Sequence, residues 1–236
     1  MTYDAPHRKT QDVAMRLLIA GKKFSVVAVP WVERKPRRFI YAHRPAEMTW
    51  PCEPIGDPAP FFKQFGITYE VCEKGWLFEV LLKMDPTLVV LGGAGILPKP
   101  IVDGFRVLNV HPGFLPECRG LDILKWSILE GKKVGVTAHL CDEHADLGWR
   151  ICDALVPVYH QDTFHSFAMR QYERELSLVV RSINELGNKT KDQLTRIHDF
   201  GTKSRRRMPV SREADLLPAF MAFKEKYART MGGYEK

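Results

Sequence analysis

The sequence lacks any long hydrophobic run, and no uninterrupted apolar stretch approaches the roughly 20 residues that a membrane-spanning helix needs. The N-terminal stretch MTYDAPHRKTQD has no apolar core of the kind found in a signal peptide. The five cysteines are odd in number and contain no CxxC pair, which argues against a disulfide framework and against a structural zinc site. Together these absences predict a cytoplasmic protein with no membrane span and no metal site.

The net charge of +7 is concentrated at the C-terminal end of the chain. From Gly187 onward there are 12 Lys and Arg residues against 6 Asp and Glu residues, so the preceding part is nearly neutral. We therefore predict two regions, a body over residues 1–186 and a basic C-terminal tail over residues 187–236. Within the tail, Pro218–Tyr227 is expected to form a helix that packs back on the body.

The tail contains a run of three arginines, Arg205, Arg206 and Arg207. Such a run is either solvated or in contact with substrate phosphates or nucleic acid. Nucleic acid is the less favoured partner, because the aromatic residues of a base-stacking surface are absent around the run. We expect a chain cut after about Gly201 to keep a folded body.

Short apolar runs alternate with stretches of helical periodicity over the body. This alternation is typical of a doubly wound α/β fold, in which a mostly parallel sheet is covered by helices. The expected strands are Phe24–Val29, Ile67–Val71, Thr87–Leu91, Phe105–Val110, Val134–Cys141 and the extended segment Trp149–Tyr159. The expected helices are Gln11–Ala20, Phe61–Phe65, Trp76–Lys83, Leu121–Glu130 and Thr163–Leu186, and residues 31–60 are expected to form a long loop.

The first strand of such a sheet is expected to be truncated. The first helix starts almost at Met1, so Met1–Tyr3 can supply only the last rung of a central strand. We expect the sheet to show a gap there, and roughly 5–8 apolar, β-branched residues to precede Met1 in the natural chain.

The stretch RVLNVHPGFLPECRG, Arg106–Gly120, places two chemically capable side chains at the end of a strand. Residues two apart in a strand point to the same face, so Asn109 and His111 should project side by side. Pro112 cannot donate to a sheet ladder, so the strand should end at His111. Open α/β sheets bind their ligands at the carboxyl ends of strands, which makes this pair a candidate site.

A third candidate residue, Asp146, follows the next strand in the turn CDEHADLG. If that strand runs parallel to its neighbour, the turn lies beside Asn109 and His111. An Asn amide can donate to a developing oxyanion, an imidazole can donate or shuttle a proton, and a carboxylate can orient or accept. No side-chain nucleophile is needed, so this set fits direct attack of a substrate amine on a carbonyl.

The segments NVHPGFLPECRG and GVTAHLCDEHADLG, separated by 14 residues, resemble the signature of the folate-dependent formyltransferases. That family has an Asn-x-His-Pro-x-x-Leu-Pro-x-x-x-Gly loop and a Gly-Val-Thr-x-His strand that leads to an Asp-x-Gly turn. The resemblance covers roughly Val26–Leu186 in element order, and it implies that residues 1–186 are the catalytic domain. It also implies that Asn109, His111 and Asp146 are the catalytic residues.

The same resemblance implies that the formyl donor is 10-formyltetrahydrofolate. Its pterin is expected to contact the loop Gly95, Ile96 and Leu97 and the turn that begins at Cys141 and Asp142. The reaction is then an N-formyl transfer to a primary amine, with no metal and no redox cofactor.

The acceptor is expected to be a small molecule, most similar to the substrates of amino-sugar-nucleotide N-formyltransferases in surface-glycan biosynthesis. Methionyl-tRNA formyltransferases add a C-terminal β-barrel that the tail lacks the strand pattern to build. Glycinamide ribonucleotide formyltransferases begin with a Gly-rich phosphate loop, and the N-terminal stretch TYDAPHRKTQD has none. A formyltetrahydrofolate hydrolase, a formyltransferase with another acceptor, and a non-catalytic folate-fold binding module with a basic tail are the alternatives. Oligomerisation is possible.

Three further features have plain structural interpretations. His139 lies inside an apolar strand and is interpreted as a satisfied core residue near the site. Cys118 is interpreted as a small buried thiol rather than a residue of the acceptor side. The run Gly92-Gly93-Ala94-Gly95 lacks GxGxxG spacing, so it is interpreted as a turn in close approach to a flat ring.

Overall fold

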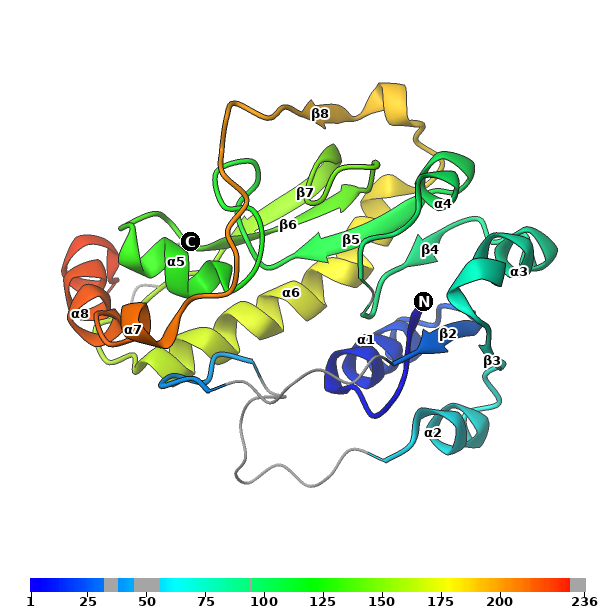
Figure 1. Cartoon of the computed structure of the whole chain (residues 1–236), viewed down its shortest axis with the longest axis horizontal. Helices are drawn as coiled ribbons and strands as arrows, with labels where there is room; N and C mark the ends of the chain where they lie inside the picture. The colour runs from blue at the N-terminus through cyan, green and yellow to red at the C-terminus, as the bar shows by residue number, and fades with distance from the viewer. Residues whose placement is uncertain (32–37, 45–55, 94, 230–236) are drawn as a thin grey trace.

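The computed structural model describes residues 1–31, 38–44, 56–93 and 95–229. Over these residues, strands and helices alternate along the chain and the strands gather into one central layer (Figure 1). The predicted α/β class is thereby confirmed. Much of the loop predicted for residues 31–60 lies outside the described residues. None of the helices within the described residues is long and apolar enough to cross a membrane.

The strands form two groups, with orders β1-β2-β3 and β4-β5-β6-β7-β8. Pairing is parallel between β1 and β2, β2 and β3, and β4 and β5, whereas β6, β7 and β8 each run antiparallel to the preceding strand. The sheet is therefore mixed. The bounds are β1 Thr2–Asp4, β2 Val26–Pro30, β3 Tyr69–Val71, β4 Val89–Val90, β5 Val107–His111, β6 Gly135–Leu140, β7 Gly148–Leu155 and β8 Thr195–Ile197.

The two groups of strands meet at Met1. Its amino group donates to the Val90 carbonyl at 2.8 Å, and its own carbonyl accepts from the Gly92 N–H at 3.0 Å. Burial lowers the pKa of this amino group to about 5. The expected short first strand and interrupted sheet are thus present, while the expectation that residues precede Met1 stays a prediction.

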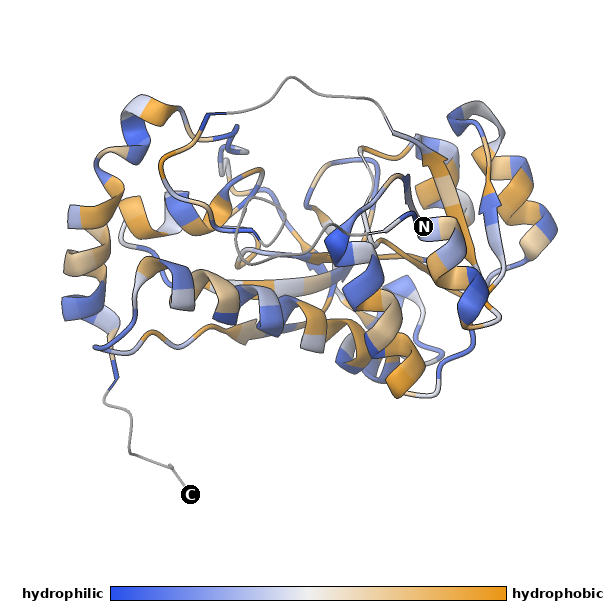
Figure 2. Ribbon diagram, turned by 90° about the horizontal axis from the view of Figure 1, so that it is seen from below, coloured by the Kyte–Doolittle hydropathy of each residue, from blue (hydrophilic) through white to orange (hydrophobic). Residues whose placement is uncertain are grey.

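Helices cover both faces of the sheet, as a doubly wound fold requires. Leu108 and Val110 of β5 are buried with side chains of α1 and α6, whereas Val107 is buried on the other face with side chains of α3 and α4. Hydrophobic and hydrophilic bands alternate along α6, the long horizontal helix of Figure 2, as expected of a helix with one buried face. The helix bounds are α1 Arg8–Ile19, α2 Pro58–Gln64, α3 Leu77–Met84, α4 Lys99–Gly104, α5 Ile123–Leu129, α6 Phe164–Leu186, α7 Val210–Glu213 and α8 Leu216–Tyr227, with short 3-10 turns at Lys74–Trp76 and Lys191–Gln193.

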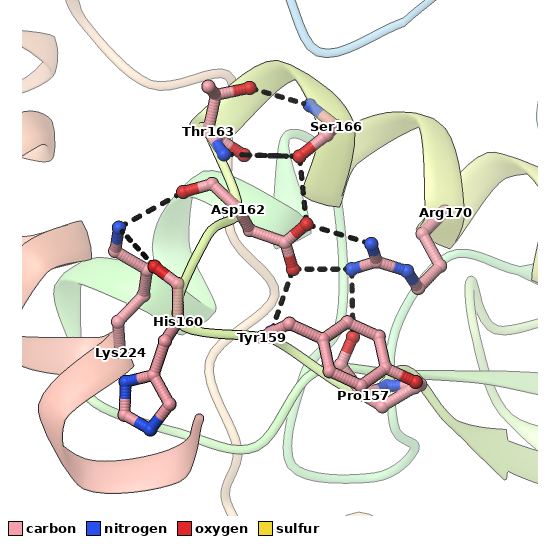
Figure 3. Close-up of polar contacts among 8 residues, drawn as sticks. All are labelled: Pro157, Tyr159, His160, Asp162, Thr163, Ser166, Arg170 and Lys224. Carbon is pink, nitrogen blue, oxygen red and sulfur yellow. Dashed lines mark hydrogen bonds and ion pairs between the residues drawn. The ribbon is translucent and has the colours of Figure 1, made fainter. Parts of the chain in front are cut away.

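The start of α6 is fixed by a polar network around Asp162 (Figure 3). The Asp162 carboxylate accepts two hydrogen bonds from the Arg170 guanidinium, at 2.5 and 2.7 Å, and one from the Ser166 hydroxyl. Thr163 and Ser166 form a capping box that satisfies exposed N–H groups of the first turn. Lys224 of α8 donates to the Asp162 carbonyl at 3.0 Å, so this network also attaches α8 to the body.

The C-terminal region is integrated into the core rather than loosely attached. The predicted tail helix is confirmed as α8, and its Phe220 and Phe223 are buried against Phe167 of α6. The division of the chain at residue 187 stays a prediction. This packing nevertheless argues against the expectation that a chain cut after Gly201 keeps a folded body, because the cut removes part of the main hydrophobic core.

We call residues 198–209, between β8 and α7, the C-terminal strap. It passes over the loop that follows β5 (Figure 1), and Arg205 makes two backbone hydrogen bonds of 2.8 Å, to Arg119 and Leu121. The Arg205 guanidinium forms an ion pair with Glu130 and lies 5.1 Å from the ring centre of Trp126. Arg205 therefore has partners of its own within the protein, and the alternatives given for the arginine run stay predictions.

Candidate active site

Asn109 and His111 lie side by side on β5, as the sequence predicts. Leu108 and Val110 point into the core beneath α1 and α6, so the alternate residues Asn109 and His111 point to the opposite face. Asn109 is half-buried, and His111 is 3% exposed. β5 ends at His111, directly before Pro112.

The His111 imidazole is bound on both of its nitrogens. Nδ1 lies 3.0 Å from Oδ1 of Asp146, and Nε2 lies 2.9 Å from the carbonyl oxygen of Cys118. Carboxylate and carbonyl oxygens only accept hydrogen bonds, so a ring that satisfies both must carry a proton on each nitrogen. The His111 ring is therefore held between two oxygen atoms, with Nδ1 facing the Asp146 carboxylate.

Asp146 is held in an unusual backbone conformation. Its φ of 58° lies in the left-handed region, which Asp and Asn tolerate better than most residues. Its second carboxylate oxygen, Oδ2, accepts a hydrogen bond of 2.8 Å from the backbone N–H of Gly120. Burial alone would raise the pKa of this carboxyl, but the facing His111 and the Gly120 N–H outweigh burial and hold the pKa at about 2. Asp146 is thus ionised at neutral pH.

The route by which Asp146 reaches His111 differs from the prediction. The expectation that the strand before Asp146 runs parallel to β5 was wrong: β6 is antiparallel, with Asn109 directly opposite His139. The loop 141–147 instead turns back over the face of the sheet. Gly148 ends this turn with a φ of 114°, and a Cβ there would lie 2.0 Å from the Leu140 carbonyl oxygen, so only glycine fits.

His139 holds the Asn109 side chain in place. Its Nδ1 donates to the Leu147 carbonyl at 2.9 Å, and its Nε2 lies 3.3 Å from the amide nitrogen of Asn109. Burial, followed by the charge of His111, lowers the pKa of His139 to about 4, so the ring is neutral and Nε2 accepts from the amide. The interpretation of His139 as a satisfied residue near the site is confirmed, but its control of the Asn109 amide is not visible in a sequence.

The loop after β5 is shaped by Thr137 and Gly113. The Thr137 hydroxyl donates to the Gly113 carbonyl at 2.9 Å and accepts from the Leu115 N–H at 3.1 Å. A Cβ on Gly113 would lie 2.4 Å from the Cys118 carbonyl oxygen and 2.8 Å from His111 Nε2. Glycine at this position therefore allows the hydrogen bond between His111 and Cys118.

The residues predicted to bind the folate occupy two adjacent loops. Leu97 is buried in the hydrophobic cluster that Cys141 packs against, whereas Gly95 and Ile96 are exposed. The loops are joined by an ion pair of 2.9 Å between Lys99 and Glu143. An exposed apolar side chain beside backbone polar groups is a suitable wall for a flat heterocycle, so the role of these residues stays a prediction that the geometry allows.

Asp142 already has partners within the protein. Its carboxylate lies 2.7 Å from the Arg196 guanidinium and accepts a hydrogen bond of 2.9 Å from the His144 N–H. Its side chain is only 8% exposed. The prediction that Asp142 contacts the cofactor is therefore untested, whereas its role in fixing the loop is plain from its contacts.

The structure also bears on the interpretations of Cys118 and of the Gly92-Gly93 turn. Cys118 is a buried thiol that accepts from the Ser127 hydroxyl at 3.3 Å, and burial raises its pKa, as expected of an unreactive cysteine. The close-approach interpretation of the Gly92-Gly93 turn holds, but its partner is α1 itself. A Cβ on Gly93 would lie 2.5 Å from the ring of His7, and one on Gly92 would lie 3.3 Å from Thr10.

Comparison with known proteins identifies the chain as a member of the formyl transferase family. The family's sequence profile matches residues 55–183, which is more than half of the chain. The chain is 31% identical over 112 residues to the methionyl-tRNA formyltransferase of Syntrophus aciditrophicus (strain SB), covering 46% of this chain and 36% of that protein. It is 36% identical over 89 residues to the dTDP-4-amino-4,6-dideoxyglucose formyltransferase of Mycobacterium tuberculosis (strain ATCC 25618 / H37Rv), covering 38% of each. The match thus spans little more than a third of the length of these relatives.

Solved structures agree on the fold. Glycinamide ribonucleotide transformylase 1 from Symbiobacterium toebii superposes with a TM-score of 0.59 at 19% identity, covering 84% of this chain and 92% of that one. A sugar N-formyltransferase from Shewanella sp FDAARGOS_354 superposes with a TM-score of 0.56 at 18% identity, covering 92% of this chain and 85% of that one. The chain therefore has the formyltransferase fold.

Proposed function

We propose that this protein is an enzyme that transfers the formyl group of 10-formyltetrahydrofolate to a primary amine of a nucleotide-linked amino sugar. The observation that carries this proposal is the His111–Asp146 pair, whose facing atoms are 3.0 Å apart, beside Asn109 at the carboxyl end of β5. In this reaction the amine nitrogen forms a bond to the formyl carbon, and the bond from that carbon to N10 of the folate breaks. One proton leaves the amine and one arrives at N10, so the proton balance closes without an oxidant or a metal.

Each of the three residues has a chemical role in the proposal. Asn109 keeps one amide N–H for the oxyanion after its bond to His139, since an amide has two. The His111 ring helps to stabilise the same negative charge, and Asp146 orients the ring. Asp146 itself stays ionised, because its pKa of about 2 lies far below neutral pH.

The residues present fit a folate donor. Leu97 and the exposed Ile96 supply apolar surface, and the adjacent loop 141–147 supplies the polar side chains of Asp142 and Asp146. Such a combination of an apolar wall and a few polar groups is common in sites for flat heterocycles. The four described cysteines are free thiols, in keeping with the reducing cytoplasm in which this reaction is expected.

A sugar nucleotide is proposed as the acceptor because of one relative in the comparison. This relative is named as a dTDP-4-amino-4,6-dideoxyglucose formyltransferase, and it is 36% identical to this chain over the 89 matched residues.

The test is a panel of acceptors incubated with 10-formyltetrahydrofolate, with release of tetrahydrofolate followed by absorbance and the formylated product by mass spectrometry. The panel contains nucleotide-linked amino sugars, glycinamide ribonucleotide, methionyl-tRNA and buffer alone, and His111→Ala is the control for background reaction. Turnover with an amino sugar nucleotide supports the proposal. Formate release in buffer alone indicates a hydrolase, and no turnover with any acceptor indicates a non-catalytic binding module.

A further inference from the structure

We propose that Arg119 is a positioning residue that transmits the order of the C-terminal strap to the His111–Asp146 pair. This inference rests on the proposed function, because it concerns the same pair of residues. Arg119 stands directly before Gly120, whose N–H binds the Asp146 carboxylate at 2.8 Å. Its guanidinium is almost fully buried, with 8% of the side chain exposed.

The guanidinium of Arg119 joins two loops that are far apart in the sequence. Nη2 donates to the carbonyl of Ala145 at 3.0 Å, one residue before Asp146. Nη1 donates to Oδ2 of Asp199 at 2.7 Å and approaches the carbonyl of Thr202 at 3.4 Å, both in the C-terminal strap. One side chain therefore connects the strap to the residue that precedes the proposed catalytic carboxylate.

Asp199 is itself rigidly placed for this contact. Its other oxygen, Oδ1, accepts from the N–H groups of Gly201 at 3.0 Å and Thr202 at 3.1 Å. The hydrogen bond from Arg119 is the main reason that the pKa of Asp199 lies below its usual range. The carboxylate thus fixes the turn of the strap with one oxygen and Arg119 with the other.

The loop that carries Asp146 is attached to the C-terminal region at a second point. Arg196 of β8 forms an ion pair of 2.7 Å with Asp142 and lies 4.3 Å from the ring centre of Trp149. The loop 141–147 is therefore held near both of its ends, by Arg196 at Asp142 and by Arg119 at Ala145. Loosening the Arg119 end leaves the loop attached but frees the segment next to Asp146.

Only an arginine can make these contacts together. Its planar fork presents separate N–H groups to two partners, whereas a lysine has a single nitrogen at its tip. Catalytic geometry is sensitive to small displacements, because a misplacement of about 1 Å can lower a rate about 100-fold. We therefore expect substitutions at this contact to lower kcat while binding of both substrates is retained.

The test compares Arg119→Lys and Asp199→Asn with the matched pair Arg212→Lys and Asp215→Asn. Arg212 and Asp215 form an exposed ion pair of 3.8 Å at the C-terminal end of α7, away from the loop 141–147. We expect kcat with the acceptor found active to fall about 10-fold for Arg119→Lys and Asp199→Asn, with KM for both substrates within about 2-fold of the wild type. The two control variants should keep kcat within about 2-fold. Asp199→Asn preserves the shape of a half-exposed side chain, so it tests the contact even if Arg119→Lys fails to fold.

A second readout needs no acceptor. In proton NMR, the N–H of His111 that faces Asp146 should give a low-field signal, which is assigned by its absence in His111→Ala. Loss or displacement of this signal in Asp199→Asn, but not in Asp215→Asn, supports the positioning role whatever the acceptor is. An unchanged signal together with unchanged kcat in a folded Asp199→Asn protein overturns it. A wild-type protein that shows the signal but formylates no acceptor contradicts the proposed function instead.

Discussion

The side-chain amide of Asn109 is held by the imidazole of His139, 3.3 Å away on the directly opposite residue of β6. Because Nδ1 of His139 is bound to the Leu147 carbonyl, the remaining nitrogen presents a lone pair to the amide. This contact fixes which way the amide faces and leaves one amide N–H for a ligand. The sheet register thus orients a proposed oxyanion donor through a buried neutral histidine.

Replacing His139 with Leu should lower kcat for formyl transfer by about 10-fold or more, because the Asn109 amide loses its fixed orientation. KM for the folate should change little, since His139 is buried behind the site. Steady-state kinetics measure both quantities. His165→Leu is the control, because His165 is an exposed histidine on α6, outside the loops of the candidate site. Equal kcat in the wild type and His139→Leu would falsify the orienting role.

The same histidine predicts a dependence of stability on pH. Burial lowers the pKa of His139 from 6.5 to about 4 in the folded protein, so between these values the unfolded chain binds more protons than the folded one. The contribution of His139 to the free energy of unfolding is therefore complete above pH 6.5. It falls by roughly 3 kcal/mol as the pH decreases toward 4. His7, whose pKa burial lowers to about 4, acts in the same direction.

Urea denaturation at pH 7, 5.5 and 4 tests this expectation. The free energy of unfolding should fall with pH for the wild type and fall less steeply for His139→Leu, and the difference between the two curves isolates this residue. Parallel curves would mean that His139 takes up no extra proton on unfolding.

Asp146→Asn should lower kcat about 100-fold while folate binding is kept. Asn tolerates the left-handed conformation of this position, where φ is 58°, and its side-chain oxygen can still accept from the Gly120 N–H. The carboxylate that faces and orients the His111 ring is lost, so the ring is held less firmly. Folate binding is measured by quenching of tryptophan fluorescence and turnover by tetrahydrofolate release.

The control is Asp103→Asn, which replaces an exposed carboxylate on α4 and should behave as the wild type. Weakened folate binding with normal turnover of the bound enzyme would contradict the assignment.

The sequence predicted those parts of the molecule that depend on local patterns. The long helix Phe164–Leu186 follows from its 3.6-residue periodicity, and β5 follows from its apolar run and the proline after it. The placement of Asn109 and His111 on one face follows from the strand period alone. These features need no information about distant residues.

The remaining parts depend on contacts between residues that are far apart in the chain. The antiparallel direction of β6 has no local signal, because an apolar run reads the same in either direction. Arg119 and Asp199 are 80 residues apart, and neither stands in a pattern that predicts the other. The alternatives for the run containing Arg205 stayed open, because nothing local to the run indicates that Arg205 contacts Glu130 and Trp126. A sequence can therefore indicate candidate catalytic residues but not the residues that hold them in place.

Lys125 of α5 and Glu213 of α7 form an ion pair of 2.9 Å in which both side chains are completely buried. Glu213 also accepts hydrogen bonds from the backbone N–H groups of Ile40, at 2.6 Å, and Tyr41, at 3.2 Å. The pair therefore ties together three segments, α5, α7 and residues 40–41. A buried pair of this kind adds little net stability over an apolar pair, but removing one partner leaves a charge that water cannot reach.

Glu213→Gln should lower the free energy of unfolding by about 3–5 kcal/mol, because it leaves the Lys125 ammonium buried without a counter-charge. Lys125→Met should cost less, since the Glu213 carboxylate keeps its two backbone donors. The double variant has no unpaired ammonium. The free energy of unfolding that it loses should therefore be smaller than the sum of the losses in the two single variants. Urea denaturation followed by tryptophan fluorescence measures the free energy of unfolding of all three variants.

The exposed pair Arg181 and Glu185 is the control. Arg181→Met and Glu185→Gln should each change the free energy of unfolding by no more than about 0.5 kcal/mol. Strictly additive losses at Lys125 and Glu213 would show that the two charges do not depend on each other.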